Sequence, residues 1–438
     1  MGSNCLTSGQ KLCVRVRVRV RVGGTETSRK RKREGGAGLA LKLRHSAETK
    51  VRLAPPRRRS ASVDSVEGSS RPSTAKPTMY RETLSTRKVP YEGGSPRFEE
   101  RVEVGFFSLD TERQFHHDNS QMRYYAEPDT APNFDLRDGY NDRYIKRDEN
   151  LRKNMEHILH WILANQSKLM QNAATSALND IDFVTSRGRL TKVLCTPYES
   201  LTEWELSVTK FNGVLYINEV ETASARQGRE KRTESHEENM YWGYKFEQYI
   251  CADTIDGLPD TSGVVNSNEA FYSVVRTRLS NHRLLFSGEV DCRDKDRKAP
   301  PPPACYLELK TTREIHTSQQ RSKFHRFKLL KWWAQSFLLG VPRIVAGIKN
   351  DDGVVVSVRT YRTAEIPQLV EGEHLGWTPA VCMNFCREFL SYVKRVVTED
   401  NPHVVYLFSR KERCELTYTV HKDSPYSFLP DWYVEKMR

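Results

Sequence analysis

Two short segments place charged side chains two residues apart in otherwise apolar surroundings. They are Gly288-Glu289-Val290-Asp291 and Leu307-Glu308-Leu309-Lys310. Residues i and i+2 of a β-strand project from the same face. If both segments are strands, each therefore presents a charged pair on one side of a sheet.

The three carboxylates and the lysine of these segments suit one kind of chemistry. Buried charges are costly unless opposite charges meet them, and carboxylate oxygens are ligands that Mg²⁺ and Mn²⁺ prefer. One or two such ions, about 3.5 to 4 Å apart when paired, lower the pKa of bound water and stabilise a departing oxygen. Lys310 would orient the nucleophile or offset developing negative charge. The spacing matches the core of PD-(D/E)xK nucleases, so it predicts metal-dependent hydrolysis of phosphodiesters.

A single charged pair of this spacing is weak evidence for a site. Glu219-Val220-Glu221 has the same spacing, and we interpret it as the solvent-facing edge of a strand. Two charged pairs on consecutive strands, one of them ending in lysine, are stronger evidence for a catalytic site than one pair alone.

Three further polar positions have two interpretations each. Glu247 lies in an aromatic helical segment as an exposed residue or as an inward-directed ligand, and the periodicity favours exposure. Gln335 is either a core amide bonded to backbone or a donor to phosphate. Arg187-Gly188, expected just before a strand, is either a loop in solvent or a phosphate contact. Spacing alone decides neither of the last two.

Helical and strand-like segments alternate around these residues. Apolar spacings of three and four predict helices, and alternation or short apolar runs between turns predict strands. The expected helices are 151–163, 241–251, 270–279, 323–339 and 380–397. The expected strands are 190–198, 204–211, 214–220, 284–292, 305–311, 343–348 and 354–359, with two more near Val404 and Leu416.

The connections between these elements predict the fold class. Asn212-Gly213 is the strongest short hairpin signal, and Asp351-Asp352-Gly353 marks a second hairpin. We therefore expect an α+β fold, with mixed central sheets flanked by helices around a PD-(D/E)xK nuclease-like core.

The positive charge of the chain lies at its N-terminus. Residues 1–100 contain 23 Lys or Arg against 9 Asp or Glu, whereas residues 101–438 contain 46 against 47. The first segment is rich in Ser, Arg, Pro and Gly, which predicts a disordered basic tail over 1–100 and a catalytic domain over 101–438. The basic run 29–33 is interpreted as a nuclear localisation signal, so the nucleus is the expected location, with the cytoplasm as a second one.

Several classes of protein find no support in the sequence. The nine cysteines form no CxxC pair, the twelve histidines form no HxH or HExxH, and neither a Walker loop nor GxGxxG occurs. No apolar run approaches the roughly 18 residues of a membrane span, so no membrane partner is expected.

Five longer motifs carry a family resemblance. They are Asn133-Phe134-Asp135-Leu136-Arg137-Asp138-Gly139-Tyr140, Gly243-Tyr244-Lys245-Phe246-Glu247-Gln248-Tyr249, Phe286-Ser287-Gly288-Glu289-Val290-Asp291-Cys292, Glu308-Leu309-Lys310-Thr311 and Lys331-Trp332-Trp333-Ala334-Gln335-Ser336-Phe337. With them the chain resembles the decapping exoribonucleases of the DXO family, from about Phe107 to the C-terminus.

The resemblance implies a role for each candidate residue. The metal ligands would be Glu247, Glu289, Asp291, Glu308 and the backbone carbonyl of Leu309, holding Mg²⁺ or Mn²⁺, with two ions during turnover. Lys310 and Gln335 would act on the scissile phosphate and its nucleophile. Arg113, Arg187 and Gly188 would line the RNA path. Tyr272 stands near the substrate where relatives carry a smaller cysteine, so this chain departs from the family at the leading nucleotide.

The implied activity is hydrolysis at RNA 5′ ends. It comprises removal of incomplete or unmethylated guanosine caps, 5′-triphosphates and NAD-type caps, followed by 5′-to-3′ degradation of the monophosphorylated body. A yeast relative that partners a nuclear 5′-3′ exonuclease supplies a second hypothesis, a binding and stabilising partner of such an enzyme. A third is a DNA nuclease on the same scaffold, because a metal cluster alone does not distinguish sugars.

Overall fold

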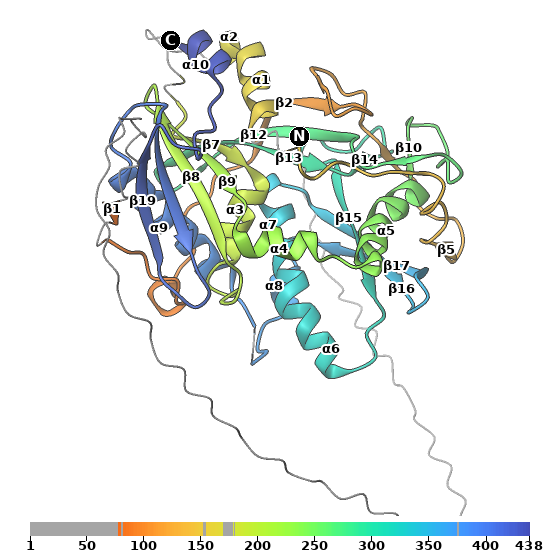
Figure 1. The fold of residues 1–438 in the computed structure, drawn as a ribbon. Helices are drawn as coiled ribbons and strands as arrows, with labels where there is room; N and C mark the ends of the chain where they lie inside the picture. Colours follow the sequence, from red (N-terminus) through yellow and green to blue (C-terminus); the bar gives the residue numbers. More distant parts are fainter. Residues whose placement is uncertain (1–77, 80–81, 152–154, 170–177, 179, 375) are drawn as a thin grey trace, which may run out of the picture. The chain divides into compact units, whose positions relative to one another are not determined.

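The computed structural model describes residues 78–79, 82–151, 155–169, 178, 180–374 and 376–438. Helices and strands alternate along these residues, and the strands form two large mixed sheets (Figure 1). The predicted α+β class with mixed sheets and flanking helices is confirmed. Among the described residues, no helix has both the length and the apolar character needed to cross a membrane.

The larger sheet has ten strands within the described part of the chain, in the order β1-β19-β18-β8-β9-β7-β13-β12-β2-β3. β7 pairs in parallel with β9 and β13, and every other neighbouring pair in the sheet is antiparallel. Its strands are β1 (Thr78–Met79), β2 (Val102–Leu109), β3 (Phe115–His116), β7 (Phe183–Ser186), β8 (Trp204–Phe211), β9 (Val214–Val220), β12 (Ala270–Leu279), β13 (His282–Val290), β18 (Val404–Arg410) and β19 (Leu416–Lys422).

The second sheet has seven described strands in the order β10-β4-β14-β15-β16-β17-β5. β15 runs parallel to β16, and β14 runs parallel to β4. Its strands are β4 (Tyr124–Tyr125), β5 (Phe134–Asp135), β10 (Cys251–Ala252), β14 (Cys292–Asp294), β15 (Tyr306–Arg313), β16 (Arg343–Lys349) and β17 (Val354–Arg362). A small ladder joins β6 (Tyr144–Ile145) to β11 (Val265–Asn266).

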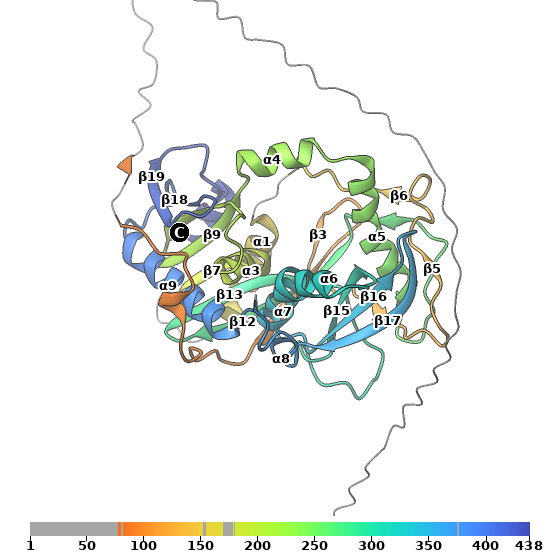
Figure 2. The same ribbon diagram turned by 90° about the horizontal axis from the view of Figure 1, so that it is seen from below.

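The helices fill the space between the sheets and cover their outer faces (Figure 2). α1 and α10 share one core with the larger sheet, α3, α7 and α9 share a second core with both sheets, and α5 packs on the other face of β15 and β16. The helices are η1 (Val89–Tyr91), α1 (Glu156–Ala164), α2 (Gln166–Leu169), α3 (Arg187–Cys195), α4 (Ala223–Glu230), α5 (Glu234–Ile250), α6 (Ser318–Lys323), the π-helical segment η2 (Phe324–Leu329), α7 (Leu330–Leu339), α8 (Ile366–Leu369), α9 (Pro379–Val396) and α10 (Asp431–Met437).

Most elements with a strong local signal form as the sequence predicts. Asn212 and Gly213 both have positive φ, 51° and 80°, as a tight hairpin between β8 and β9 requires. The second hairpin joins β16 to β17, and α1, α5, α9 and the helical run from α6 to α7 lie where helices are expected.

Two expected elements are wrong. Residues 270–279 form β12 instead of a helix, because β-branched and aromatic residues there pair with β13 along the whole strand and with β2 over most of it. Residues 190–198 do not form a strand, since most of them belong to α3, where Leu190, Val193 and Leu194 recur at helical spacing and are buried.

The predicted boundary at residue 101 lies too late in the chain. Before it, Leu84 bridges to Leu416, and Tyr91 is buried edge-to-face against Phe385 with ring centroids 5.1 Å apart. The Asn384 side chain also donates to the Tyr91 carbonyl at 3.0 Å. Residues 1–77 and 80–81 of the predicted tail, including the basic run 29–33, lie outside the described residues.

Candidate functional site

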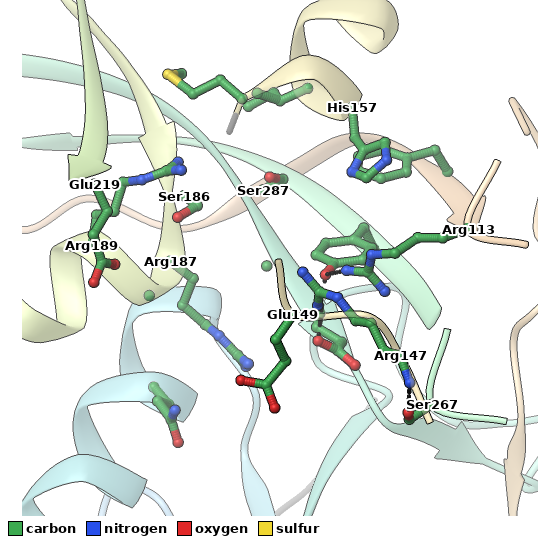
Figure 3. A pocket seen from close by; sticks show the side chains of 18 of the residues that line it. Arg113, Arg147, Glu149, His157, Ser186, Arg187, Arg189, Glu219, Ser267 and Ser287 are labelled. Atoms are coloured by element: carbon green, nitrogen blue, oxygen red, sulfur yellow. Dashed lines mark hydrogen bonds between the residues drawn. The ribbon is translucent and has the colours of Figure 1, made fainter. Parts of the chain in front are cut away.

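A pocket of about 560 Å³ opens on the larger sheet, beside the end of β13 (Figure 3). Its walls come from β2, β7, β9, β12 and β13 of the larger sheet, from the start of α3, from α1, α5 and α7, and from β6. Six of the residues singled out from the sequence line it, namely Arg113, Arg187, Gly188, Tyr272, Glu289 and Gln335.

The four candidate carboxylates come from two sheets and a helix. Glu289 is on β13, Glu308 on β15 and Glu247 on α5. Asp291 is the single residue between the end of β13 in the larger sheet and the start of β14 in the smaller one. The expectation of two charged pairs on consecutive strands is therefore wrong in detail, because the first pair spans the junction of the sheets.

Glu308 sits at the centre of a charged network. It is 1% exposed and uses both carboxylate oxygens: Arg187 Nη1 donates to Oε2 at 2.7 Å and Lys310 Nζ donates to Oε1 at 2.6 Å. The backbone N–H of Leu309 donates to Asp291 Oδ2 at 2.6 Å. These bonds tie the β15 pair to the junction residue.

The network carries surplus negative charge. Burial, reinforced by Glu308, raises the pKa of Asp291 to about 7. Burial together with Asp291 also raises the pKa of Glu247 well above its ordinary value. Burial acts in the same direction on Glu308, but Arg187 and Lys310 outweigh it and hold the pKa of Glu308 below its ordinary value. An additional cation near these carboxylates would relieve their repulsion.

The donor set fits a divalent cation by its chemistry. Four carboxylates supply hard oxygen ligands, and the pKa of Asp291 is raised by its burial and by the neighbouring Glu308. In the arrangement described, however, no three His, Cys, Asp or Glu side chains of the described residues converge as metal ligands. Glu308 is instead bound by Arg187 and Lys310, one on each carboxylate oxygen, and each oxygen keeps a second lone pair for a cation.

Arg187 and Gly188 open α3 rather than preceding a strand. Ser186, the residue before the helix, has extended backbone and makes no side-chain cap bond to it. Ser186, Arg187, Gly188 and Arg189 all line the pocket, so uncapped N–H groups at the positive end of the helix dipole stand in its wall. Such helix starts bind anions.

Arg113 and Tyr272 form the opposite wall together. Arg113 adopts positive φ in the turn after β2, and its Nη2 donates to the Tyr272 hydroxyl at 3.3 Å. That hydroxyl donates to Glu289 Oε2 at 3.4 Å. The ring of Tyr272 stacks on Phe107 with centroids 4.9 Å apart. The larger residue at this position thus joins the pocket wall to a candidate metal ligand.

Several pocket residues had not been identified from the sequence. Arg147 is one of them, and its Nε is buried without a hydrogen-bond partner among the described residues. Glu219, interpreted as a solvent-facing edge, in fact lines the pocket and accepts from Lys192 at 2.5 Å. Lys146, Arg189, Met240 and Tyr244 line the pocket as well. None stands in a pattern with local chemical meaning, because the fold alone brings them together.

Comparison with protein families and curated relatives gives extensive matches. The model described as "RAI1 like PD-(D/E)XK nuclease" matches residues 100–434. The "Decapping and exoribonuclease protein" of Xenopus laevis is 48% identical over 368 residues, covering 82% of this chain and 92% of the relative. The human protein of that description is 49% identical over 358 residues, covering 81% and 90%.

Solved structures of fungal proteins share the fold. Candida albicans Rai1 in complex with pU5-Mn²⁺ superposes with a TM-score of 0.70 at 21% identity, covering 81% of this chain and 99% of the other. Scheffersomyces stipitis Rai1 in complex with (3′-NADP)⁺ and calcium ion gives a TM-score of 0.69 at 24% identity, with the same coverage.

Proposed function

Because this chain belongs to the family of RAI1-like PD-(D/E)XK nucleases, we propose that it hydrolyses RNA 5′ ends with the help of divalent metal ions. It removes incomplete or unmethylated guanosine caps, 5′-triphosphates and NAD-type caps, and then degrades the monophosphorylated RNA in the 5′-to-3′ direction. The relatives described as decapping and exoribonuclease proteins support both activities.

One observation carries the proposal beyond family membership. The carboxylates Glu289 and Glu308, with Lys310, lie beside a pocket whose walls contribute Arg113, Arg147 and Arg187. A site that combines buried carboxylates with arginines fits a substrate that carries phosphate and needs a metal ion for its cleavage.

In this proposal the metal ligands are Glu247, Glu289, Asp291, Glu308 and the Leu309 carbonyl, and the ion is Mg²⁺ or Mn²⁺, with two bound during turnover. The fungal structures with Mn²⁺ and calcium support a divalent ion. When bound, the ions lower the pKa of water and stabilise charge on the phosphate. Lys310, held by Glu308, keeps its charge next to the reacting phosphate, since Glu308 and Asp291 raise its pKa against the effect of burial.

The remaining site residues bind and orient the RNA. Gln335 projects from α7 into the pocket and donates to the phosphate or the attacking water. The start of α3, with Arg187 and Gly188, binds a phosphate of the 5′ end, and Arg113 together with Tyr272 positions the leading nucleotide. Each of these groups acts by position and charge.

Location and protein partners follow from the same proposal. The basic run 29–33 directs the protein to the nucleus, with the cytoplasm as a further site of action. A 5′-3′ exonuclease is a proposed partner that is not required for catalysis.

The test is a panel of RNAs that differ only at the 5′ end, incubated with the full chain and Mg²⁺ or Mn²⁺. We expect release of incomplete caps, NAD and triphosphate products, followed by degradation, and loss of all products with Glu289→Ala or Asp291→Ala in folded protein. Products that persist with both variants would contradict the metal-site assignment.

Two controls separate the alternatives. Matched single-stranded DNA should be cleaved poorly, and equal cleavage would favour a DNA nuclease. Degradation of 5′-monophosphate RNA by the purified chain alone would show that a larger exonuclease is unnecessary, whereas activity only upon addition of one would favour a stabilising partner.

A further inference from the structure

Three cations gather outside the pocket, at the ends of β15, β16 and η2. Arg313 is the last residue of β15 and Lys349 the last of β16, and the parallel register places them side by side. Lys328 of η2 lies near them, because its Nζ donates to the hydroxyl of Thr312, the residue before Arg313, at 3.3 Å. Along with burial, Lys328 and Arg313 accordingly lower the pKa of Lys349. We call Arg313, Lys328 and Lys349 the strand-end cluster.

Lys349 is buried without an anion. The residue is 5% exposed. Its Nζ lies 3.5 Å from the centroid of the Trp242 ring and donates to Asn239 Oδ1 at 3.3 Å. Among the described residues it forms no ion pair with a carboxylate within 4.0 Å. A buried ammonium is costly unless an opposite charge or several acceptors meet it.

The two other cations of the cluster are poorly neutralised as well. Arg313 is 64% exposed and approaches Asp351 only at 4.0 Å, with that carboxylate 91% exposed. Lys328 is exposed and donates to the neutral hydroxyl of Thr312 at 3.3 Å. Three cations therefore gather at one end of β15 and β16 with little neutralising charge from the described residues, which favours an anion there.

The position of the cluster favours a ligand over a chance surface patch. Arg313 and Lys349 stand at the carboxyl ends of two parallel strands, where open sheets commonly bind ligands. Lys328 comes from a π-helical segment, and such segments frequently occur at functional sites.

A second cavity shares one residue with the pocket wall and another with the surroundings of the cluster. It measures about 420 Å³ and is lined by Lys231, Arg232, His236, Asn239 and Met240, with Gly228. Met240 also lines the pocket, and Asn239 is the hydrogen-bond partner of Lys349. The N-terminal half of α5, seen beside β16 and β17 in Figure 2, thus links pocket, second cavity and strand-end cluster.

We propose that the body of the RNA leaves the pocket over the N-terminal half of α5 and places its phosphates on the strand-end cluster. This inference rests on the proposed function, since the pocket holds the 5′ end. A polyanion that begins in the pocket meets Lys231 and His236 first and the cluster afterwards. Its phosphates match cations that carboxylates of the described residues neutralise little, since Arg313 has only the exposed Asp351 at 4.0 Å.

The test compares a short and a long RNA with the same 5′ end on the full chain. The variants are Lys328→Ala, Arg313→Ala and their double mutant, all at exposed positions, with Lys349→Met as a buried one. Lys411→Ala, on the exposed connection between β18 and β19, removes the same charge elsewhere and is the matched control.

We expect each exposed single variant to weaken binding of the long RNA several-fold. The slope of log K against log salt should also become shallower, by about 0.7 for each phosphate that no longer pairs with a cation. Hydrolysis of the short RNA should match the wild type, as should both properties of Lys411→Ala. Unchanged affinity for long RNA in the double mutant, or an equal loss for short RNA, would overturn the inference.

Two further results bear on the nature of the ligand. If an acidic peptide competes with neither RNA but binds the wild type and not the double mutant, the cluster takes a protein partner and the RNA track is wrong. A wild type that hydrolyses no 5′ end would refute the proposed function, and the binding arms would still report on the cluster separately.

Discussion

Arg187 and Glu308 form a buried ion pair at the meeting point of the two sheets, with 2.7 Å between Nη1 and Oε2 and side chains that are 11% and 1% exposed. The pair joins the first turn of α3 to the middle of β15. The guanidinium therefore supplies charge that the carboxylate needs, in the same region where a metal ion is proposed to bind.

Arg187→Met should lower stability strongly in the absence of metal. Removing one partner of a buried pair leaves an uncompensated charge and costs about 3–5 kcal/mol, so urea unfolding in EDTA should show a loss of this size. Added Mn²⁺ should recover part of the loss, because a cation at the carboxylates takes over the compensation.

A surface pair provides the control for this experiment. Arg362→Met breaks the exposed pair with Glu365, 3.3 Å apart and more than half exposed on both sides, and should cost less than about 1 kcal/mol. Equal Mn²⁺ stabilisation of wild type, Arg187→Met and Arg362→Met would contradict the coupling of Arg187 to the metal site.

Gly188 and Gly288 should respond in opposite ways to replacement by alanine. A Cβ at Gly188 meets no atom within 4 Å, whereas one at Gly288 would stand 2.8 Å from Leu339 and 3.1 Å from Arg187. Gly188→Ala should keep or raise the melting temperature, because alanine favours helix by up to about 1 kcal/mol, yet lower kcat/KM by filling space reserved for phosphate. Gly288→Ala should lower the melting temperature.

Two measurements on these variants distinguish a role of each glycine in substrate binding from a role in packing. Melting curves report packing and 5′-end hydrolysis reports binding. A Gly188→Ala protein with unimpaired kcat/KM would show that the open space above α3 is not used by substrate.

The sequence predicted those parts of the fold and site whose signals are local. Asn212-Gly213 determines its hairpin by backbone conformation, and Glu308-x-Lys310 brings carboxylate and ammonium together on one strand face. Residues 270–279 were misassigned because their conformation depends on pairing with the following strand β13 and with β2, which is distant in the chain. Arg187 was placed in a loop for a similar reason. Its ion-pair partner Glu308 is distant in the chain, and only the fold brings the two side chains together.

The remaining site residues were beyond local inference. Glu247 was expected to be exposed by periodicity and entered the site only through family resemblance, and Arg147 and Lys349 were not considered at all. Their environments arise where α5, the two sheets and the strand ends converge. Residues that only the fold brings together show no regular spacing in the sequence, so the sequence alone does not identify them.

Tyr272 should set the preference among 5′ ends. Its hydroxyl bridges Arg113 and Glu289, and its ring fills the wall beside Phe107. Tyr272→Phe removes only the bridge and should reduce kcat/KM for all 5′ ends by a similar factor. Tyr272→Cys also enlarges the pocket, so the ratio of kcat/KM for NAD-capped to monophosphorylated RNA should rise. An unchanged ratio in Tyr272→Cys would remove this residue from substrate selection.

Asp182 should contribute to resistance against acid. Burial opposes its ionisation, but three bonds from Arg283 and one from Lys394 outweigh burial and hold the pKa of Asp182 at about 2. Because this pKa lies below the unfolded value, the stabilisation is present above about pH 4 and is lost as pH falls toward 2. Asp182→Asn should thus cost about 2 kcal/mol at neutral pH and little near pH 2, as measured by urea unfolding. A constant difference across this range would contradict the assignment.

Lys349 should make stability rise with pH on the alkaline side. Burial, Lys328 and Arg313 lower its pKa to about 7 in the folded protein, so the folded state loses this proton near pH 7 while the unfolded state holds it until about pH 10.5. Between these values the unfolded state binds more protons, and wild type should gain stability over Lys349→Met, by up to about 1.4 kcal/mol per pH unit. Below pH 7 the variant should be the more stable protein, because it buries no cation.

Long RNA supplies the missing anion and raises the pKa of Lys349, so the difference in slope between wild type and Lys349→Met should shrink when RNA is bound. Thermal unfolding from pH 6 to 10 with and without RNA measures both effects, and parallel pH profiles for the two proteins without RNA would show that Lys349 is already neutralised within the fold.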